Sequence, residues 1–209
     1  MKVKLLKIAI FLSALLPLAH LAWKAFHDGL GANPIEVITH STGDWTLIFL
    51  SLTLAITPLR KITGMNPLIR FRRMLGLFAF FYACLHFTTY IWLDKFFDVR
   101  EMVKDVGKRP FITVGFSAFV LLIPLAATST AGMIRRLGKR WLRLHQLIYV
   151  SGVLGVVHYW WLVKRDVSKP ELYALIIGSL LAVRLALWWR KRAVQPGLRA
   201  PHPETAAGD

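Results

Sequence analysis

Two histidines, His86 and His158, lie inside long apolar stretches, where an unpartnered polar side chain is costly. The charged residue before each stretch allows their depths to be estimated, because an α-helix rises about 1.5 Å per residue. His86 is 13 residues beyond Arg73, roughly 20 Å, and His158 is 15 residues beyond Arg143, roughly 22 Å. Two imidazoles at one level on parallel helices can clamp a flat macrocycle. We predict that they are the axial pair of a b-type haem; the alternative is that each hydrogen-bonds a neighbouring helix.

A third histidine, His145, lies only about 3 Å inside its apolar stretch. It cannot share an iron with His86, because both nitrogens must lie within about 2 Å of the metal. Thirteen residues at 100° also place it about 140° around the helix from His158. The positions at its depth on the third stretch are Arg72 and Arg73. His145 can hold a second haem with a weaker partner, contact a flavin or quinone, anchor haem propionates with the arginines, or be an ordinary interfacial histidine.

The other four histidines offer less chemistry. His20 lies three residues after Pro17, which is expected to kink that helix. We expect His20 to be a satisfied core histidine, and a contact with a cofactor is the alternative. His27 and His40 are expected in the first outer loop, where water solvates them. His202 lies in a tail rich in Pro and Gly that has no core-forming pattern.

The predicted haem needs apolar walls and space. Gly152 and Gly155 remove side-chain bulk on the same stretch as His158, and we expect them to make room for the porphyrin. Arg184 is the only cation well inside an apolar stretch; pairing with a propionate, pairing with a carbonyl, and extending toward the cytoplasmic edge all remain open. The aromatic residues expected to line the plate are Phe80, Phe81, Phe87, Tyr90, Tyr159 and Trp160.

The elements that must position these residues are transmembrane helices. The chain has 209 residues, of which 56% are hydrophobic and 18% charged, which is typical of a membrane protein. We predict an all-α integral membrane protein: a six-helix haem-binding bundle over residues 1–192, then a disordered cytoplasmic tail over 193–209. The second span should begin at a cap formed by Ser41 or Thr42, and the first should be a retained anchor and not a cleaved signal. The expected spans are about 8–26, 45–59, 74–93, 110–128, 142–163 and 172–189.

The positive charge alternates between the connections. One side holds 17 Lys and Arg residues and the other 9, and the poorer side also carries nine of the 11 carboxylates. Both termini should therefore be cytoplasmic, with His86 and His158 in the outer half of the bilayer. The net charge of +16 belongs to the cytoplasmic rim, so we expect contact with membrane lipid and no binding of nucleic acid.

Several chemistries are excluded. The single cysteine, Cys84, rules out an intrachain disulfide and a CxxC metal site. No GxGxxG, GxxxxGK[ST] or HExxH motif is present, and no catalytic residue is predicted. A haem in this chain could relay electrons, but the electron donor and the electron acceptor must be other molecules, such as a quinone, a flavin or another protein. The outer connection 94–109 is amphipathic and is expected to form a short helix on the membrane surface.

Six spans, one histidine late in the third and two histidines 13 residues apart in the fifth resemble the ferric reductase-like transmembrane family. Larger relatives carry two histidines on each of these helices and a cytoplasmic FAD/NADPH domain. This chain departs on both counts, because it has no inner histidine on the third span and stops at a short tail. In this shorter form it resembles the family's small haem-binding subunits of bacterial methionine sulfoxide repair systems. The stretches that carry the likeness are "HSTGDWTL" (40–47), "RRMLGL" (72–77), "YACLHFTTYIWLD" (82–94), "KRPFITVGF" (108–116), "LAATS" (125–129) and "WLRLHQLIYVSGVLGVVHYWW" (141–161).

This resemblance implies a multi-pass protein of the bacterial inner membrane with haem b and FMN, and haem-associated histidines at His86, His145 and His158. It further implies electron transfer from the quinone pool, or a cytoplasmic flavin, to a periplasmic molybdopterin-dependent reductase that repairs oxidised methionine. The chain would then be an electron-transfer subunit and not the catalytic one. Two alternatives stay open: a reductase acting directly on ferric or cupric chelates, and a transporter or scaffold with structural histidines.

Overall fold

The computed structural model describes residues 2–193, and every regular element in that part of the chain is helical. Residues 194–209 of the predicted tail, with His202, lie outside the described residues. The elements are α1 (Lys2–Phe26), α2 (Pro34–Thr63), η1 (Asn66–Leu68), α3 (Ile69–Thr88), η2 (Thr89–Asp94), α4 (Val99–Lys108), α5 (Pro110–Ala127), α6 (Ala131–Leu137), α7 (Lys139–Leu144), α8 (Leu147–Leu162) and α9 (Ser168–Ala193).

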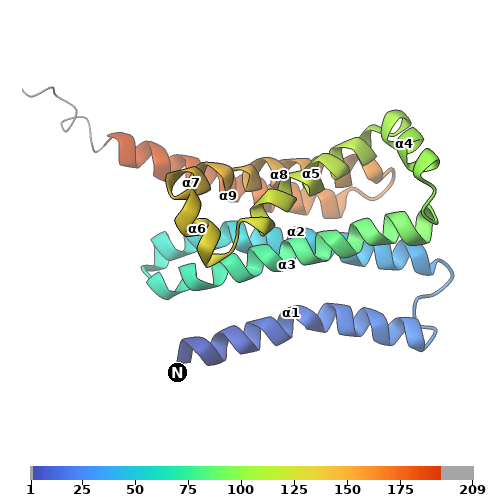
Figure 1. Cartoon of the computed structure of the whole chain (residues 1–209), viewed down its shortest axis with the longest axis horizontal. Helices are drawn as coiled ribbons and strands as arrows, with labels where there is room; N and C mark the ends of the chain where they lie inside the picture. The colour runs from blue at the N-terminus through green and yellow to red at the C-terminus, as the bar shows by residue number, and fades with distance from the viewer. Residues whose placement is uncertain (1, 194–209) are drawn as a thin grey trace, which may run out of the picture.

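The long helices run beside one another along the longest axis of the molecule (Figure 1). The N-terminus, the α2–α3 connection, α6 and α7 lie at one end, and α4 and the α8–α9 connection lie at the other. In the described part of the chain, five helices are long and apolar enough to cross a membrane. The remaining predicted span corresponds to α8, which has only 16 residues and is shorter than the roughly 20 that a crossing needs.

The second predicted span begins earlier than expected. The cap at Ser41 or Thr42 was wrong, because α2 already begins at Pro34, after Asn33. The Asn33 side chain accepts a hydrogen bond from the backbone N–H of Glu36 at 3.3 Å and donates one to its carboxylate at 2.8 Å. This reciprocal cap, followed by proline at the first helical position, is a strong start signal. The hydroxyl of Thr42 donates instead to the carbonyl of Ile38 inside the helix.

Two histidine predictions change with this boundary. His40 was expected in a solvated loop, but it lies inside α2 and is only partly exposed. His20 was expected in the core, but its side chain is exposed on α1, which packs loosely against the rest of the bundle. His27 does lie in the exposed turn after α1, where it stacks on Trp23 with ring centroids 3.8 Å apart.

The best-packed part of the core lies between α2 and α3, with α8 and α9 against α2. Leu50 and Leu54 of α2 and Ile177 of α9 are almost completely buried there. Tyr82 of α3 is also buried, and its hydroxyl donates to the carbonyl of Ala14 at 2.8 Å, which attaches α1 to this core. The core therefore packs both α3 and α8 against α2.

Arg184 binds inside the bundle. Its guanidinium donates to the carbonyl of Leu54 at 2.6 and 3.2 Å and to the hydroxyl of Tyr149 at 2.7 Å. Pro58 lies four residues after Leu54 in α2 and has no N–H, so that carbonyl has no partner within its own helix. Arg184 supplies the missing donor, which decides among the three alternatives in favour of a carbonyl.

The connection between η2 and α5 contains the predicted short helix, α4, which is amphipathic. Asp98 caps it by accepting from the N–H of Glu101 at 3.0 Å, and the ammonium of Lys95 contacts the carboxylate of Asp105 at 2.6 Å. This hydrogen bond raises the pKa of Lys95 and lowers the pKa of Asp105. Its place on a membrane surface stays a prediction.

Candidate functional site

The structure brings His86 of α3 and His158 of α8 together. Their ring centroids are 6.1 Å apart and the ring planes make an angle of 76°. A metal–imidazole bond of about 2 Å plus a ring radius of about 1 Å puts the centroids of two axial ligands about 6 Å apart. The separation of the rings therefore suits two imidazoles on opposite sides of one metal ion.

Each ring is held through Nδ1 by a backbone carbonyl of a neighbouring helix. Nδ1 of His86 lies 3.0 Å from the carbonyl oxygen of Thr39 on α2, and Nδ1 of His158 lies 2.7 Å from that of Phe111 on α5. Because a carbonyl only accepts, Nδ1 must carry the proton in both rings. Nε2 is then the unprotonated nitrogen, the form in which histidine binds a metal.

A glycine lies four residues after each of these carbonyls and makes room for the ring. A Cβ added to Gly43 would lie 3.2 Å from Cε1 of His86, and one added to Gly115 would lie 2.5 Å from Nδ1 of His158. In a helix the residues i and i+4 share a face, so each imidazole lies over the missing side chain and reaches the carbonyl behind it. The same arrangement therefore occurs twice, on α2 for one ring and on α5 for the other.

The predicted role of the α8 glycines was wrong. A Cβ on Gly152 would meet Leu50, Leu54 and Ile177, and one on Gly155 would meet Leu47 at 3.2 Å. Both glycines therefore let α8 approach α2, and Gly152 also faces α9; neither faces the histidine pair.

The aromatic wall also differs from the prediction. Phe87 packs against Phe119 and Phe116 of α5, with centroids 4.6 and 5.7 Å apart, and Phe80 stacks on Phe119 at 5.9 Å. Phe81 instead packs in the core against Phe78. Of the other predicted members, Tyr159 faces His40 and Tyr173, Trp160 is exposed, and Tyr90 lies near Lys95.

Two imidazoles alone leave most coordination positions of a metal unfilled. In residues 2–193 no group of three or more His, Cys, Asp or Glu side chains converges on one point. A porphyrin supplies four ligands in a plane and needs only two more, one on each face. The donor set and its spacing therefore fit a haem iron with two axial histidines.

His145 lies apart from this pair, at the end of α7 just before α8 begins. Its Nδ1 lies 3.1 Å from the carbonyl oxygen of Trp141, whose ring stacks on the imidazole at 3.8 Å. Its Nε2 is buried and makes no hydrogen bond within the described residues. Arg72 interacts electrostatically with His145 and with Arg184, whereas Arg73 is exposed. Arg72 therefore lies close enough to His145 to affect it electrostatically, and the contact of either arginine with a cofactor stays a prediction.

Comparison with known proteins agrees with these features. Residues 42–156 match the family described as "Ferric reductase like transmembrane component", a family of multi-pass membrane proteins. Three relatives bear the name "Protein-methionine-sulfoxide reductase heme-binding subunit MsrQ". That of Herminiimonas arsenicoxydans is 62% identical over 90% of this chain and 88% of its own length. Those of Ralstonia nicotianae and Bordetella pertussis are 54% and 52% identical, over 91% and 90% of this chain and 88% and 92% of their own lengths.

Proposed function

The chain belongs to the ferric reductase-like transmembrane family and, within it, to the MsrQ subunits, and on that premise we propose that it is the haem-binding electron-transfer subunit of a protein-methionine-sulfoxide reductase system. The observation that supports this most directly is the pair His86 and His158, whose rings are 6.1 Å apart with both Nε2 atoms available as ligands. The bound group would be a b-type haem, which supplies reversible one-electron chemistry.

The residues around the pair set the properties of that site. The carbonyls of Thr39 and Phe111 orient the two rings and fix the tautomer that binds metal. Phe111 lies beside His158, with ring centroids 6.2 Å apart, and adds an apolar ring next to the pair, which limits the access of water. The chain's contribution is therefore to hold, orient and shield, while the reduction of methionine sulfoxide belongs to the partner subunit.

The direction of electron flow follows from topology. We propose six crossings, the fifth made by α8 together with the end of α7, with both termini in the cytoplasm of the inner membrane. His86 and His158 then lie in the outer half of the bilayer, close to a periplasmic molybdopterin-dependent partner. The quinone pool, or a cytoplasmic flavin, is the proposed electron source. The larger number of basic residues at the end with the N-terminus supports this orientation.

The cluster near His145 is proposed to bind a second group. Its buried Nε2 has no hydrogen bond in the described residues, and Arg72 lies within electrostatic range. A second haem would use Nε2 as a ligand, whereas FMN would place its phosphate against the guanidinium. The amounts of iron and flavin bound per chain distinguish these two cases.

The test is a reduced-minus-oxidised absorption spectrum of the purified chain with measured iron and protein contents. We expect a low-spin b-type spectrum that His86→Ala and His158→Ala abolish, with His20→Ala, exposed on α1, as the matched control. A colourless preparation would favour the transporter or scaffold. Fast reduction of ferric chelates by the haem-loaded chain without any partner would favour the direct metal reductase.

A further inference from the structure

Three side chains that exchange protons lie one turn apart on α2. Glu36, His40 and Asp44 follow one another at intervals of four residues, so they share one face and span about 12 Å of the helix. The carboxylate of Glu36 lies 3.8 Å from Nε2 of His40. Glu36 is close to the start of the helix, whereas Asp44 lies deeper and its side chain is only 18% exposed. The three form a row, which we call the α2 ladder, leading inward from the outer end of the bundle.

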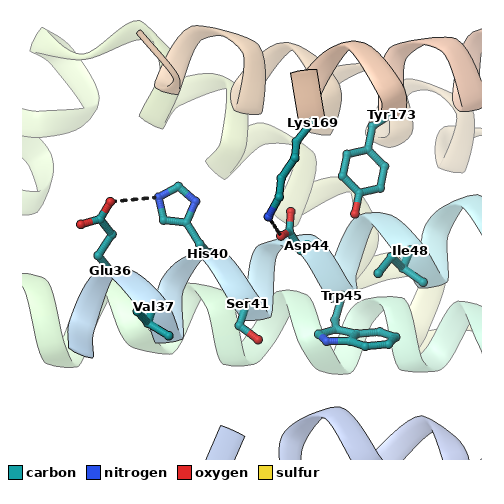
Figure 2. Close-up of a pocket in the computed structure, with 9 residues that line it drawn as sticks. All are labelled: Glu36, Val37, His40, Ser41, Asp44, Trp45, Ile48, Lys169 and Tyr173. Carbon is teal, nitrogen blue, oxygen red and sulfur yellow. Dashed lines mark hydrogen bonds and ion pairs between the residues drawn. The ribbon is translucent and has the colours of Figure 1, made fainter. Parts of the chain in front are cut away.

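Asp44 is a carboxylate within a span, and such residues rarely occur without a function. Its partner is Lys169 at the start of α9, whose ammonium lies 2.8 Å from the carboxylate. Figure 2 shows His40 and Asp44 on α2 facing Lys169 and Tyr173 on α9. The ion pair and the ladder therefore border the same space between two helices.

That space is a pocket of about 590 Å³, which also has apolar lining from Val37, Trp45 and Ile48. Gly43, which faces the ring of His86, is not among the residues that line this pocket. The pocket is nevertheless close to the histidine pair. His40 lies 6.4 Å, centroid to centroid, from Tyr159, the residue after His158.

We propose that this pocket binds the headgroup of a membrane quinol and that the α2 ladder carries away its protons. The proposal rests on the proposed function, in which quinol is an electron donor. A quinol is apolar enough to arrive through lipid and carries two hydroxyl groups that need hydrogen-bond acceptors, which His40 and Asp44 provide. Its ring can pack against Tyr173 and Ile48.

The chemistry balances. Oxidation of one quinol to quinone breaks two O–H bonds and releases two protons and two electrons. The protons pass to Asp44 and His40 and leave by Glu36 to the outer aqueous phase. The oxidant would be a b-type haem held by His86 and His158, which would supply one-electron chemistry, with the partner subunit as the final electron acceptor. Electrons from a quinol in this pocket enter close to His86 and His158, so they need no second haem nearer the cytoplasm. The third span accordingly has no histidine in its cytoplasmic half.

The test measures binding of ubiquinol-1, a quinol with one isoprene unit, to the haem-loaded chain in lipid nanodiscs by calorimetry, with the haem kept reduced by dithionite so that the quinol is not oxidised. We expect saturable binding that weakens about tenfold in His40→Ala and in Asp44→Ala, the effect of one lost hydrogen bond. His27→Ala removes an exposed histidine outside the pocket and should leave binding unchanged. Binding that is equally tight in all variants, or absent in the haem-loaded wild type, overturns the proposal.

A second variant separates proton transfer from binding. His40→Gln keeps a side chain that can hydrogen-bond but cannot take up a proton at neutral pH. It should bind ubiquinol-1 normally when its haem is already reduced, yet reduction of its oxidised haem by ubiquinol-1 should slow about tenfold, while dithionite still reduces it fully. Unchanged reduction by ubiquinol-1 refutes the ladder. A haem-free wild type would instead refute the proposed function, so the two failures are distinguishable.

Discussion

Replacing Gly115 by alanine is the sharpest test of how the histidine pair is built. The added Cβ would lie 2.5 Å from Nδ1, 2.8 Å from Cε1 and 2.9 Å from Cγ of His158, whereas ordinary contacts begin near 3.4 Å. The ring must therefore move by nearly 1 Å, several times the roughly 0.2 Å that metal–ligand bonds tolerate. Overpacking of this kind costs about 1–3 kcal/mol, so we expect haem affinity to fall roughly tenfold to a hundredfold.

Two further glycines make this a graded series. A Cβ at Gly43 would lie 3.2 Å from the ring of His86, so Gly43→Ala should lower haem affinity by a smaller factor than Gly115→Ala. A Cβ at Gly76 of α3 would meet Thr53 at 3.5 Å, an ordinary contact, and Gly76→Ala should leave haem binding unchanged. The assay is low-spin haem absorbance per protein during titration of the apoprotein. Wild-type affinity in Gly115→Ala, or equal loss in all three variants, would refute the account.

Three further predictions concern other parts of the bundle. Arg184→Met should lower the midpoint of thermal unfolding, because the carbonyl of Leu54 then loses its hydrogen-bond donor. Arg184→Lys should recover part of this loss. An unchanged midpoint in both variants would contradict the role given to Arg184. The contact with Lys95 lowers the pKa of Asp105, so its stabilisation of α4 is complete above the ordinary carboxyl pKa of 3.8 and is lost as the pH falls through the lower folded value. Proteolysis of the outer connection by pepsin should therefore accelerate over that range in the wild type but not in Asp105→Asn. His145→Ala should leave the spectrum of the histidine pair intact and reduce either the iron or the flavin content; loss of all haem absorbance in this variant would reverse the ligand assignment.

The sequence predicted the convergence of His86 and His158 because the charged ends of apolar stretches locate the membrane boundary, and depth then follows from a constant rise per residue. The direction in which a helix faces its neighbours has no such marker. This is why Gly152 and Gly155 were assigned to the cofactor, although they face α2, and why Gly43 and Gly115 were missed. One signal in the sequence could have identified Gly43 and Gly115. Each is a glycine on a span that contributes no haem ligand, and each lies four residues after a residue whose carbonyl could accept from a histidine.

His40 was misplaced for a different reason. The stretch "HSTGDW" contains three residues common at helix starts, Ser, Thr and Asp, as well as a glycine, and it resembles a helix boundary. The competing signal, Asn33 followed by Pro34 and Glu36, is stronger because it combines a reciprocal cap with a proline that already has helical geometry. The partner of Arg184 could also have been found, since Pro58 leaves one carbonyl of α2 without a donor, but only folding shows which cation reaches it.

The partners of the two imidazoles explain why the glycines are the sensitive positions of this site. In many metal sites the second nitrogen of a histidine donates to a carboxylate, and one substitution removes that partner. Here both partners are backbone carbonyls, at Thr39 and Phe111, which no side-chain replacement can delete. A carbonyl is also neutral, so it orients the ring without making it as electron-rich as a carboxylate would. Substitution can therefore disturb the orientation of the rings mainly by filling the space beside the carbonyl, and that space exists because Gly43 and Gly115 have no side chains.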